Sequence, residues 1–178
     1  MTDLQERIVG RFRWIDGHAD VWRLFSDAEL LRDIARALAD PFRGSAIGRV
    51  AGIEARGFIL APLVAVEIGA GFAAIRKEEG LFPDPKFTRR THPDYRGHRT
   101  LLRLQQAALL PNDRVLFVDD WVETGAHLVT AKALIESTGA HLAGVSVVVE
   151  EIAPDIRQMV PAFCALVRAA DLGAGGAI

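Results

Sequence analysis

Two adjacent carboxylates, Asp119 and Asp120, follow the run Arg114–Val118, whose last four residues are apolar and include two β-branched valines. Such a run is typical of a buried strand, and helical spacing at 128–137 follows a Thr-Gly turn. Carboxylates at a strand end can accept hydrogen bonds from sugar hydroxyls, and free backbone N–H groups at 124–126 can bind phosphate. The pattern predicts a site for a ligand with hydroxyls and phosphate, and helix capping by the acids is the alternative.

Two other loops bring cations to the same predicted edge of the sheet. Arg56 follows a short apolar strand at 49–53, and Arg76 and Lys77 follow another at 71–75. Because carboxyl ends of parallel strands meet at one edge, we expect these cations near the acid pair. Cations beside a pair of acids suit a sugar that carries phosphate groups at two positions. Mg²⁺ would bridge the acid pair and the pyrophosphate of such a ligand. Solvated surface positions are the alternative for each cation.

Strands and helices alternate along the chain, which predicts parallel strands joined by right-handed crossovers. We expect a helix over 30–38 that follows a capping box at Ser26–Glu29 and stops before Pro41. Further helices are expected at 57–68, ending at Gly69, and at 128–137. Strands are expected at 49–53, 71–75, 114–118, 144–150 and 162–167. The fold class is therefore α/β, with a parallel sheet flanked by helices in a single domain over 1–178.

Residues 78–99 interrupt this alternation with three prolines, several basic residues and little apolar periodicity. A long insertion of this kind is typical of a functional lid or a disordered segment, and we expect a flexible loop that closes over the site. The pattern at 100–109 fits a helix or a strand. The glycine-rich end at 173–178 is expected to fray.

Composition narrows the function classes. The 178 residues are half hydrophobic with a net charge of −2, which gives no support to a nucleic-acid or membrane binder. Cys164 is the only cysteine, which rules out an intrachain disulfide and fits a reducing compartment. No signal peptide or membrane-spanning run is visible, so a cytoplasmic protein is expected. No strand is followed by Gly-x-Gly-x-x-Gly, and no Gly-Lys-Ser or Gly-Lys-Thr occurs, which argues against dinucleotide-binding oxidoreductases and P-loop NTPases.

The segment Val115–His127 resembles the phosphoribosyl pyrophosphate motif of the type I phosphoribosyltransferases. Val50–Leu60 and Gly71–Lys77 are similar to the adenine-using branch of that family. The likeness spans roughly residues 26–168. It implies a Rossmann-like sheet, an N-terminal hood at 1–25 and a flexible catalytic loop at 78–99.

The resemblance also implies an activity. Adenine and phosphoribosyl pyrophosphate would give AMP and pyrophosphate, a purine-salvage reaction. Mg²⁺ would be carried by the donor near Asp119 and Asp120, with no assured direct ligation by the protein. A homodimer is implied as well.

Residue roles follow from the same resemblance. The acids Asp119 and Asp120 would hold the ribose hydroxyls, and a loop would bind the 5′-phosphate through Glu123, Thr124, Gly125, Ala126 and His127. The pyrophosphate would contact Ala55 and Arg56, in a turn that often has a non-proline cis peptide in this family, with Arg76 and Lys77 nearby. Asp94 would assist proton transfer at the purine, so the implied catalytic residues are Asp94, Asp119, Asp120 and Arg56.

The chain departs from the family pattern at Trp121, Glu123 and His127, and its hood is shorter. In the hood, Trp22 or Phe25 could stack on a planar base and Asp20 or Arg23 could bond its edge, with core packing as the alternative for the aromatics. These departures leave open a phosphoribosyltransferase for another base or an amine acceptor. A non-catalytic regulator that senses phosphoribosyl pyrophosphate is the remaining alternative.

Overall fold

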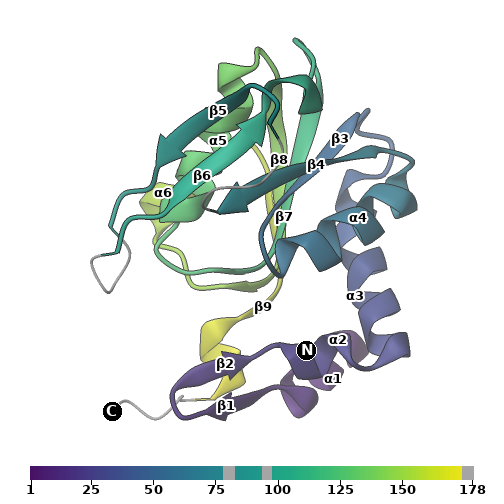
Figure 1. Cartoon of the computed structure of the whole chain (residues 1–178). Helices are drawn as coiled ribbons and strands as arrows, with labels where there is room; N and C mark the ends of the chain where they lie inside the picture. The colour runs from purple at the N-terminus through teal and green to yellow at the C-terminus, as the bar shows by residue number, and fades with distance from the viewer. Residues whose placement is uncertain (78–82, 94–97, 174–178) are drawn as a thin grey trace.

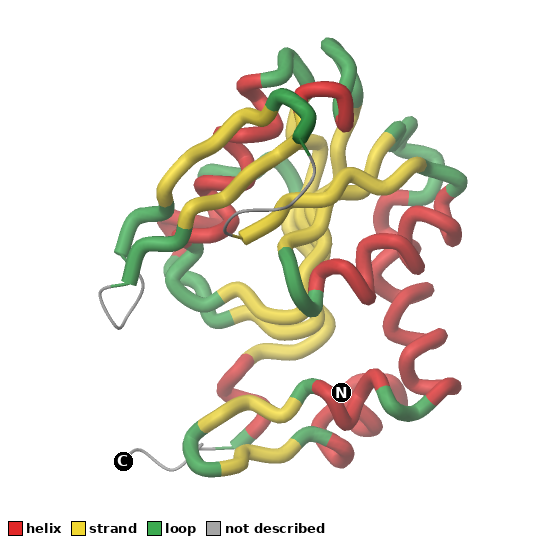
Figure 2. The backbone as a smooth tube through the Cα atoms, in the orientation of Figure 1, coloured by secondary structure: helices red, strands yellow, loops and turns green. Residues whose placement is uncertain are grey.

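A seven-stranded sheet runs through the protein, and helices pack on both of its faces (Figures 1 and 2). The computed structural model describes residues 1–77, 83–93 and 98–173. The strand order is β5-β6-β4-β3-β7-β8-β9. The strands are β3 (Arg49–Ile53), β4 (Gly71–Lys77), β5 (Lys86–Arg90), β6 (Leu101–Gln105), β7 (Arg114–Val122), β8 (His141–Glu150) and β9 (Phe163–Arg168).

The sheet is parallel in its centre and antiparallel at one edge. Strands β4, β3, β7, β8 and β9 are parallel, which confirms the predicted β-α-β alternation. The expectation that 78–99 lacks regular structure is wrong in part, because residues 86–90 form β5, antiparallel to β6. Three of the five β5 residues are exposed, so the apolar pattern that announces a strand is weak there. Backbone pairing with β6 therefore stabilises β5 as a strand. The segment 100–109, whose pattern fits a helix or a strand, contains β6 and is thus a strand over 101–105.

Three longer helices cover the sheet: α3 (Ala28–Ala39) and α4 (Gly57–Ile68) on one face and α5 (Ala126–Ser137) on the other. As predicted, α3 ends before Pro41, and Gly69 ends α4 with a φ of 70°. The predicted capping box is wrong by one residue. Asp27 caps α3, its Oδ1 accepting the N–H of Glu29 and Leu30 at 3.1 and 3.0 Å.

The first 25 residues form a small hood at one end of the sheet (Figure 1). It consists of α1 (Asp3–Arg11), a hairpin of β1 (Arg13–Ile15) and β2 (His18–Asp20), and the short α2 (Trp22–Phe25). The chain end η3 (Ala169–Leu172), which follows β9, lies beside it (Figure 1). Within the part of the chain that the structure describes, no helix has the length and apolar character needed to cross a membrane.

Aromatic rings join the hood to the central strand β7. The rings of Phe12 and Trp14 lie 5.2 Å apart in a T-shaped arrangement. Trp121 of β7 contacts both, at 5.8 Å from Trp14 and 6.1 Å from Phe12. The hood therefore packs directly against the strand that carries Asp119 and Asp120.

Strand β3 and helix α4 approach each other through their backbones. A Cβ on Gly52 would lie 2.5 Å from the carbonyl oxygen of Gly57 and 2.8 Å from Cβ of Ala61. Neither contact can be relieved by rotating a flexible side chain. This close packing fixes the loop 54–56 at the end of β3.

Gly52→Ala should therefore lower the free energy of unfolding by about 1–3 kcal/mol or more, because the added methyl forces β3 and α4 apart. Gly10→Ala in α1 is the matched control, since nothing lies within 4 Å of the added Cβ. That control should be neutral or stabilising by up to about 1 kcal/mol. Chemical denaturation measures both, and equal stability of the two variants would contradict the packing described above.

Candidate active site

A cavity of about 920 Å³ opens between the carboxyl ends of the sheet strands and the hood. The sheet edge contributes Glu54, Ala55, Arg56, Lys77, Asp119, Asp120 and the loop 123–127. The hood contributes Trp14, Gly17, His18 and Ala19, and Trp121 and Glu151 also line the cavity. The structure thus brings together most of the residues that the sequence assigns to the sugar-phosphate donor.

The acid pair lies within β7 rather than beyond its end. The predicted strand stopped at Val118, but pairing with β8 continues to Val122. Asp120 is almost fully buried, and its Oδ2 lies 3.1 Å from Nε of Arg56. Asp119 accepts the backbone N–H of Asp120 at 2.9 Å. A Cβ on Gly57 would lie 3.1 Å from Oδ1 of Asp119, so this glycine makes room for the carboxylate.

Burial raises the pKa of Asp119 well above its usual value, and the adjacent carboxylate of Asp120 raises it further. The backbone N–H of Asp120 and the charge of Lys77 oppose this effect without cancelling it. Two neighbouring acids at a cavity wall destabilise the fold when both are ionised. Such an arrangement is typical of a functional site rather than of a structural ion pair.

The loop after β3 carries the cation that faces the acid pair. It contains a cis peptide bond between Glu54 and Ala55, as the resemblance implied. Arg56 follows at the N-terminus of α4 and pairs with Asp120. The loop therefore places a guanidinium and the backbone of Ala55 on one side of the cavity.

Arg76 and Lys77 leave β4 beside this loop but differ in position. Glu54 lies 3.3 Å from Nη2 of Arg76 and accepts the backbone N–H of Lys77 at 3.2 Å. The hydrogen bond with Arg76 lowers the pKa of Glu54. Lys77 lines the cavity, whereas Arg76 is not among its lining residues. Glu54 thus ties the ends of β3 and β4 together.

The loop before α5 has the geometry of an anion site. Gly125 adopts a φ of 76° at the start of the helix, and the first N–H groups of a helix have no partner within it. A Cβ on Gly125 would collide with Ile156 of the short helix α6 (Pro154–Gln158). A glycine is therefore required here both by its backbone angle and by the packing of α6 on the loop.

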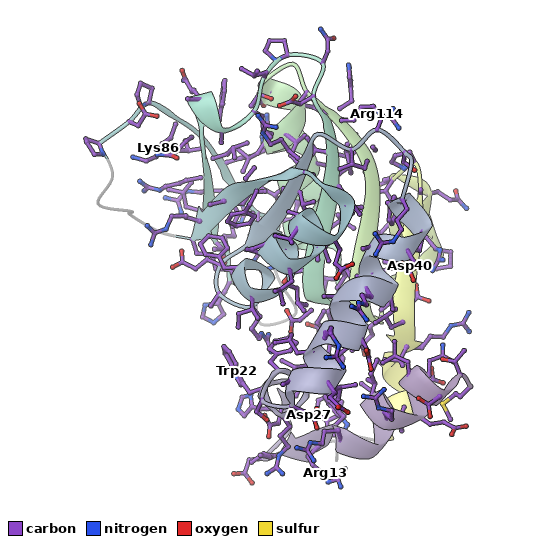
Figure 3. The ribbon with its side chains drawn as sticks, turned by 90° about the vertical axis from the view of Figure 1, so that its right-hand side faces the viewer. Arg13, Trp22, Asp27, Asp40, Lys86 and Arg114 are labelled. Atoms are coloured by element: carbon purple, nitrogen blue, oxygen red, sulfur yellow. The ribbon has the colours of Figure 1, made fainter. Side chains whose placement is uncertain are left out.

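The hood residues that sequence reasoning assigned to the base lie elsewhere. Trp22, 53% exposed, packs edge-to-face on Phe25, and Arg23 pairs with Asp20 at 2.7 Å. Figure 3 shows Trp22 on the outer surface of the hood. None of Trp22, Arg23 and Phe25 is among the described residues that line the cavity.

The β1–β2 hairpin lines the cavity instead, through Trp14 and through 17–19. Sequence reasoning missed this element, although a signal was present. Asp16-Gly17 is a preferred hairpin turn, and both residues have the positive φ that such a turn requires, 47° and 73°. Asp94, the predicted proton-transfer residue, lies outside the described residues.

Asp119→Asn should stabilise the fold at neutral pH. The folded pKa of Asp119 is raised, so the wild-type protein loses stability as pH rises from the unfolded-state pKa through the folded-state pKa. The variant lacks this loss, so its unfolding temperature should exceed that of the wild type at neutral pH by a few degrees, at about 2–4 °C per kcal/mol. The difference should vanish near pH 4, as thermal unfolding across pH 4–8 can establish. A variant that is less stable at neutral pH would contradict the raised pKa.

Comparison with known proteins agrees with this geometry. The Phosphoribosyl transferase domain family matches residues 23–163. Adenine phosphoribosyltransferase of Thermobifida fusca is 40% identical over 131 residues, covering 74% of this chain and 73% of the relative. That of Bifidobacterium animalis subsp. lactis is 39% identical over 133 residues, covering 74% and 67%. The crystal structure of adenine phosphoribosyltransferase from Rhodothermus marinus superposes with a TM-score of 0.81 at 27% identity, covering 93% of this chain and 98% of that one. The chain belongs to the type I phosphoribosyltransferase family.

Proposed function

We propose that the protein is an adenine phosphoribosyltransferase, which converts adenine and phosphoribosyl pyrophosphate to AMP and pyrophosphate. The observation that carries the proposal is one cavity that holds the acid pair, Arg56 and the loop before α5. The names of the similar enzymes favour adenine as the base.

We propose that the donor lies along the sheet edge. Asp119 and Asp120 accept hydrogen bonds from the ribose hydroxyls, as ionised carboxylates do. The 5′-phosphate lies at the loop 123–127, where the helix N-terminus attracts an anion. Glu123 and His127 flank this phosphate, and the backbone N–H groups remain its principal donors.

The pyrophosphate lies on the opposite side of the acid pair, near Ala55, Arg56 and Lys77. Arg56 is the cation best placed to hold the departing group, because it already faces the cavity beside Asp120. Arg76 lies behind the cavity lining and adds positive charge near the pyrophosphate. Its ion pair with Glu54 must break before its side chain can contact phosphate directly.

Mg²⁺ suits the carboxylate oxygens of Asp119 and Asp120. In this proposal the ion arrives with the phosphates of the donor. When bound, it would neutralise charge on the departing pyrophosphate. A cation here would also favour the ionised form of Asp119.

The reaction forms a bond from a base nitrogen to the anomeric carbon and breaks the bond from that carbon to pyrophosphate. The sugar becomes oxocarbenium-like, so nearby carboxylates stabilise it, and Arg56 stabilises the leaving group. Water must be excluded from such a sugar, which is the role expected of the loop 78–99. Asp94 of this loop is expected to assist proton transfer at the base.

We also propose a cytoplasmic homodimer. Leu63 and Val66 of α4 and Phe72 of β4 are exposed to 37%, 81% and 37%. Phe72 packs edge-to-face on Phe58, which extends this apolar surface along α4. Adjacent exposed apolar residues of this kind are typical of a subunit contact.

The proposed function is tested by turnover with a panel of bases. Purified protein, phosphoribosyl pyrophosphate and Mg²⁺ are incubated separately with adenine, hypoxanthine, guanine and pyrimidines, and nucleotide is quantified by chromatography. AMP should form with adenine, and a chelator should abolish its formation. Turnover with a different base but not adenine would contradict the proposed acceptor. Donor binding without turnover of any base or amine would favour a regulator.

A further inference from the structure

Glu151 is a cavity residue to which the donor assigns no role. It lies one position beyond β8 and lines the wall that also includes Trp121. Its Oε2 accepts the indole Nε1–H of Trp121 at 3.2 Å, and its backbone N–H donates to the carbonyl of Val122 at 2.8 Å. Both its backbone and its side chain are therefore held by the end of β7.

Trp121 is itself fixed, because it packs against Trp14 and Phe12 of the hood. An indole held between strand and hood has little rotational freedom. Its N–H therefore orients the Glu151 carboxylate, which would otherwise sample many rotamers. The result is a negative charge held in a defined position beside the hood.

The other cavity carboxylates have different neighbours. Glu54 pairs with Arg76, and Asp120 pairs with Arg56. Asp119 belongs to the sugar site and Glu123 to the phosphate loop. Glu151 is bonded to Trp121, which packs on Trp14 of the hood, and the hood side of the cavity is where the base is expected.

An ionised carboxylate only accepts hydrogen bonds, and it has about four acceptor positions. The indole of Trp121 uses one of them. The others can accept the exocyclic N–H of a 6-aminopurine, whereas the carbonyl oxygen of a 6-oxopurine would meet a like partial charge. A satisfied hydrogen bond in one complex and a repulsive contact in the other favour binding of the 6-aminopurine.

We propose that Glu151 selects 6-aminopurines over 6-oxopurines by accepting the exocyclic N–H, and that Trp121 is the positioning residue that holds its carboxylate. This inference rests on the proposed phosphoribosyltransfer to a purine. It assigns the choice between adenine and hypoxanthine to one side chain outside the donor site.

Glu151→Gln tests the inference. A glutamine amide can turn either its oxygen or its NH2 toward the base, so the variant should tolerate both purines. The ratio of kcat/KM for adenine to that for hypoxanthine should fall about 10- to 100-fold, the effect of one hydrogen bond to a charged group. The KM for phosphoribosyl pyrophosphate should stay within about twofold of the wild type, because Glu151 lies outside the donor site.

Glu150→Gln is the matched control. It makes the same acid-to-amide change one residue earlier, but Glu150 pairs with Arg157 and Arg168 and is not among the described residues lining the cavity. Its base ratio should equal that of the wild type. A Glu151→Gln ratio within about twofold of the wild type would overturn the selectivity role. A wild-type protein that does not use adenine would instead overturn the proposed function, before any variant is measured.

Trp121→Phe tests the positioning role, because it keeps a ring against the hood and removes the N–H. It should lower the base ratio in the wild-type background and leave the ratio unchanged in the Glu151→Gln background. A purely structural Trp121 would change the rates for both bases equally and leave the ratio alone. Equal effects of Trp121→Phe on the ratio in both backgrounds would overturn the coupling.

Discussion

The ion pair between Arg56 and the buried Asp120 is the constraint on which the site depends. Two carboxylates adjacent in a central strand repel each other, and burial increases the cost. The guanidinium offsets part of that cost only because β3 and α4 meet at Gly52 and Gly57. A larger residue at either glycine would displace the loop that carries Arg56. Backbone packing some distance from the chemistry thus sets the geometry of the acid pair.

The same strand joins the two ends of the cavity. Asp120 lines the cavity beside Arg56, and the next residue, Trp121, contacts the hood and Glu151. The position of the hood and the position of the acid pair are therefore coupled through adjacent residues of β7. The hood contacts that strand through Phe12 and Trp14, whose rings pack on Trp121.

Much of this arrangement could be predicted from local sequence. Apolar runs identified the five parallel strands, and Gly69 marked the end of α4, because these features follow from short-range backbone preferences. The carboxyl-edge rule placed Arg56, Lys77 and the acid pair in one cavity. The continuation of β7 through Asp119 and Asp120 was missed, because it depends on pairing with β8 and not on the residues themselves.

The hood side of the cavity, where the base is proposed to bind, could not be predicted in the same way. Trp22 and Phe25 have suitable ring types, but the fold turns Trp22 outward and brings Trp14 inward. The proposed role of Glu151 depends on a contact between residues thirty positions apart. The ion pair of Arg76 with Glu54 likewise joins two strand ends, and no local pattern announces it. Such contacts depend on tertiary geometry, whereas the donor motif lies within one continuous segment.

The central claim is that the acid pair of β7 holds the sugar of the donor at the moment of transfer. The most direct measurement is AMP formation by a variant in which Asp119 and Asp120 are both asparagine, with circular dichroism and thermal unfolding as checks on its fold. Asparagine keeps the size of each side chain and removes the charge. We predict a folded protein whose turnover is lost. Turnover equal to that of the wild type would contradict the assignment of the site.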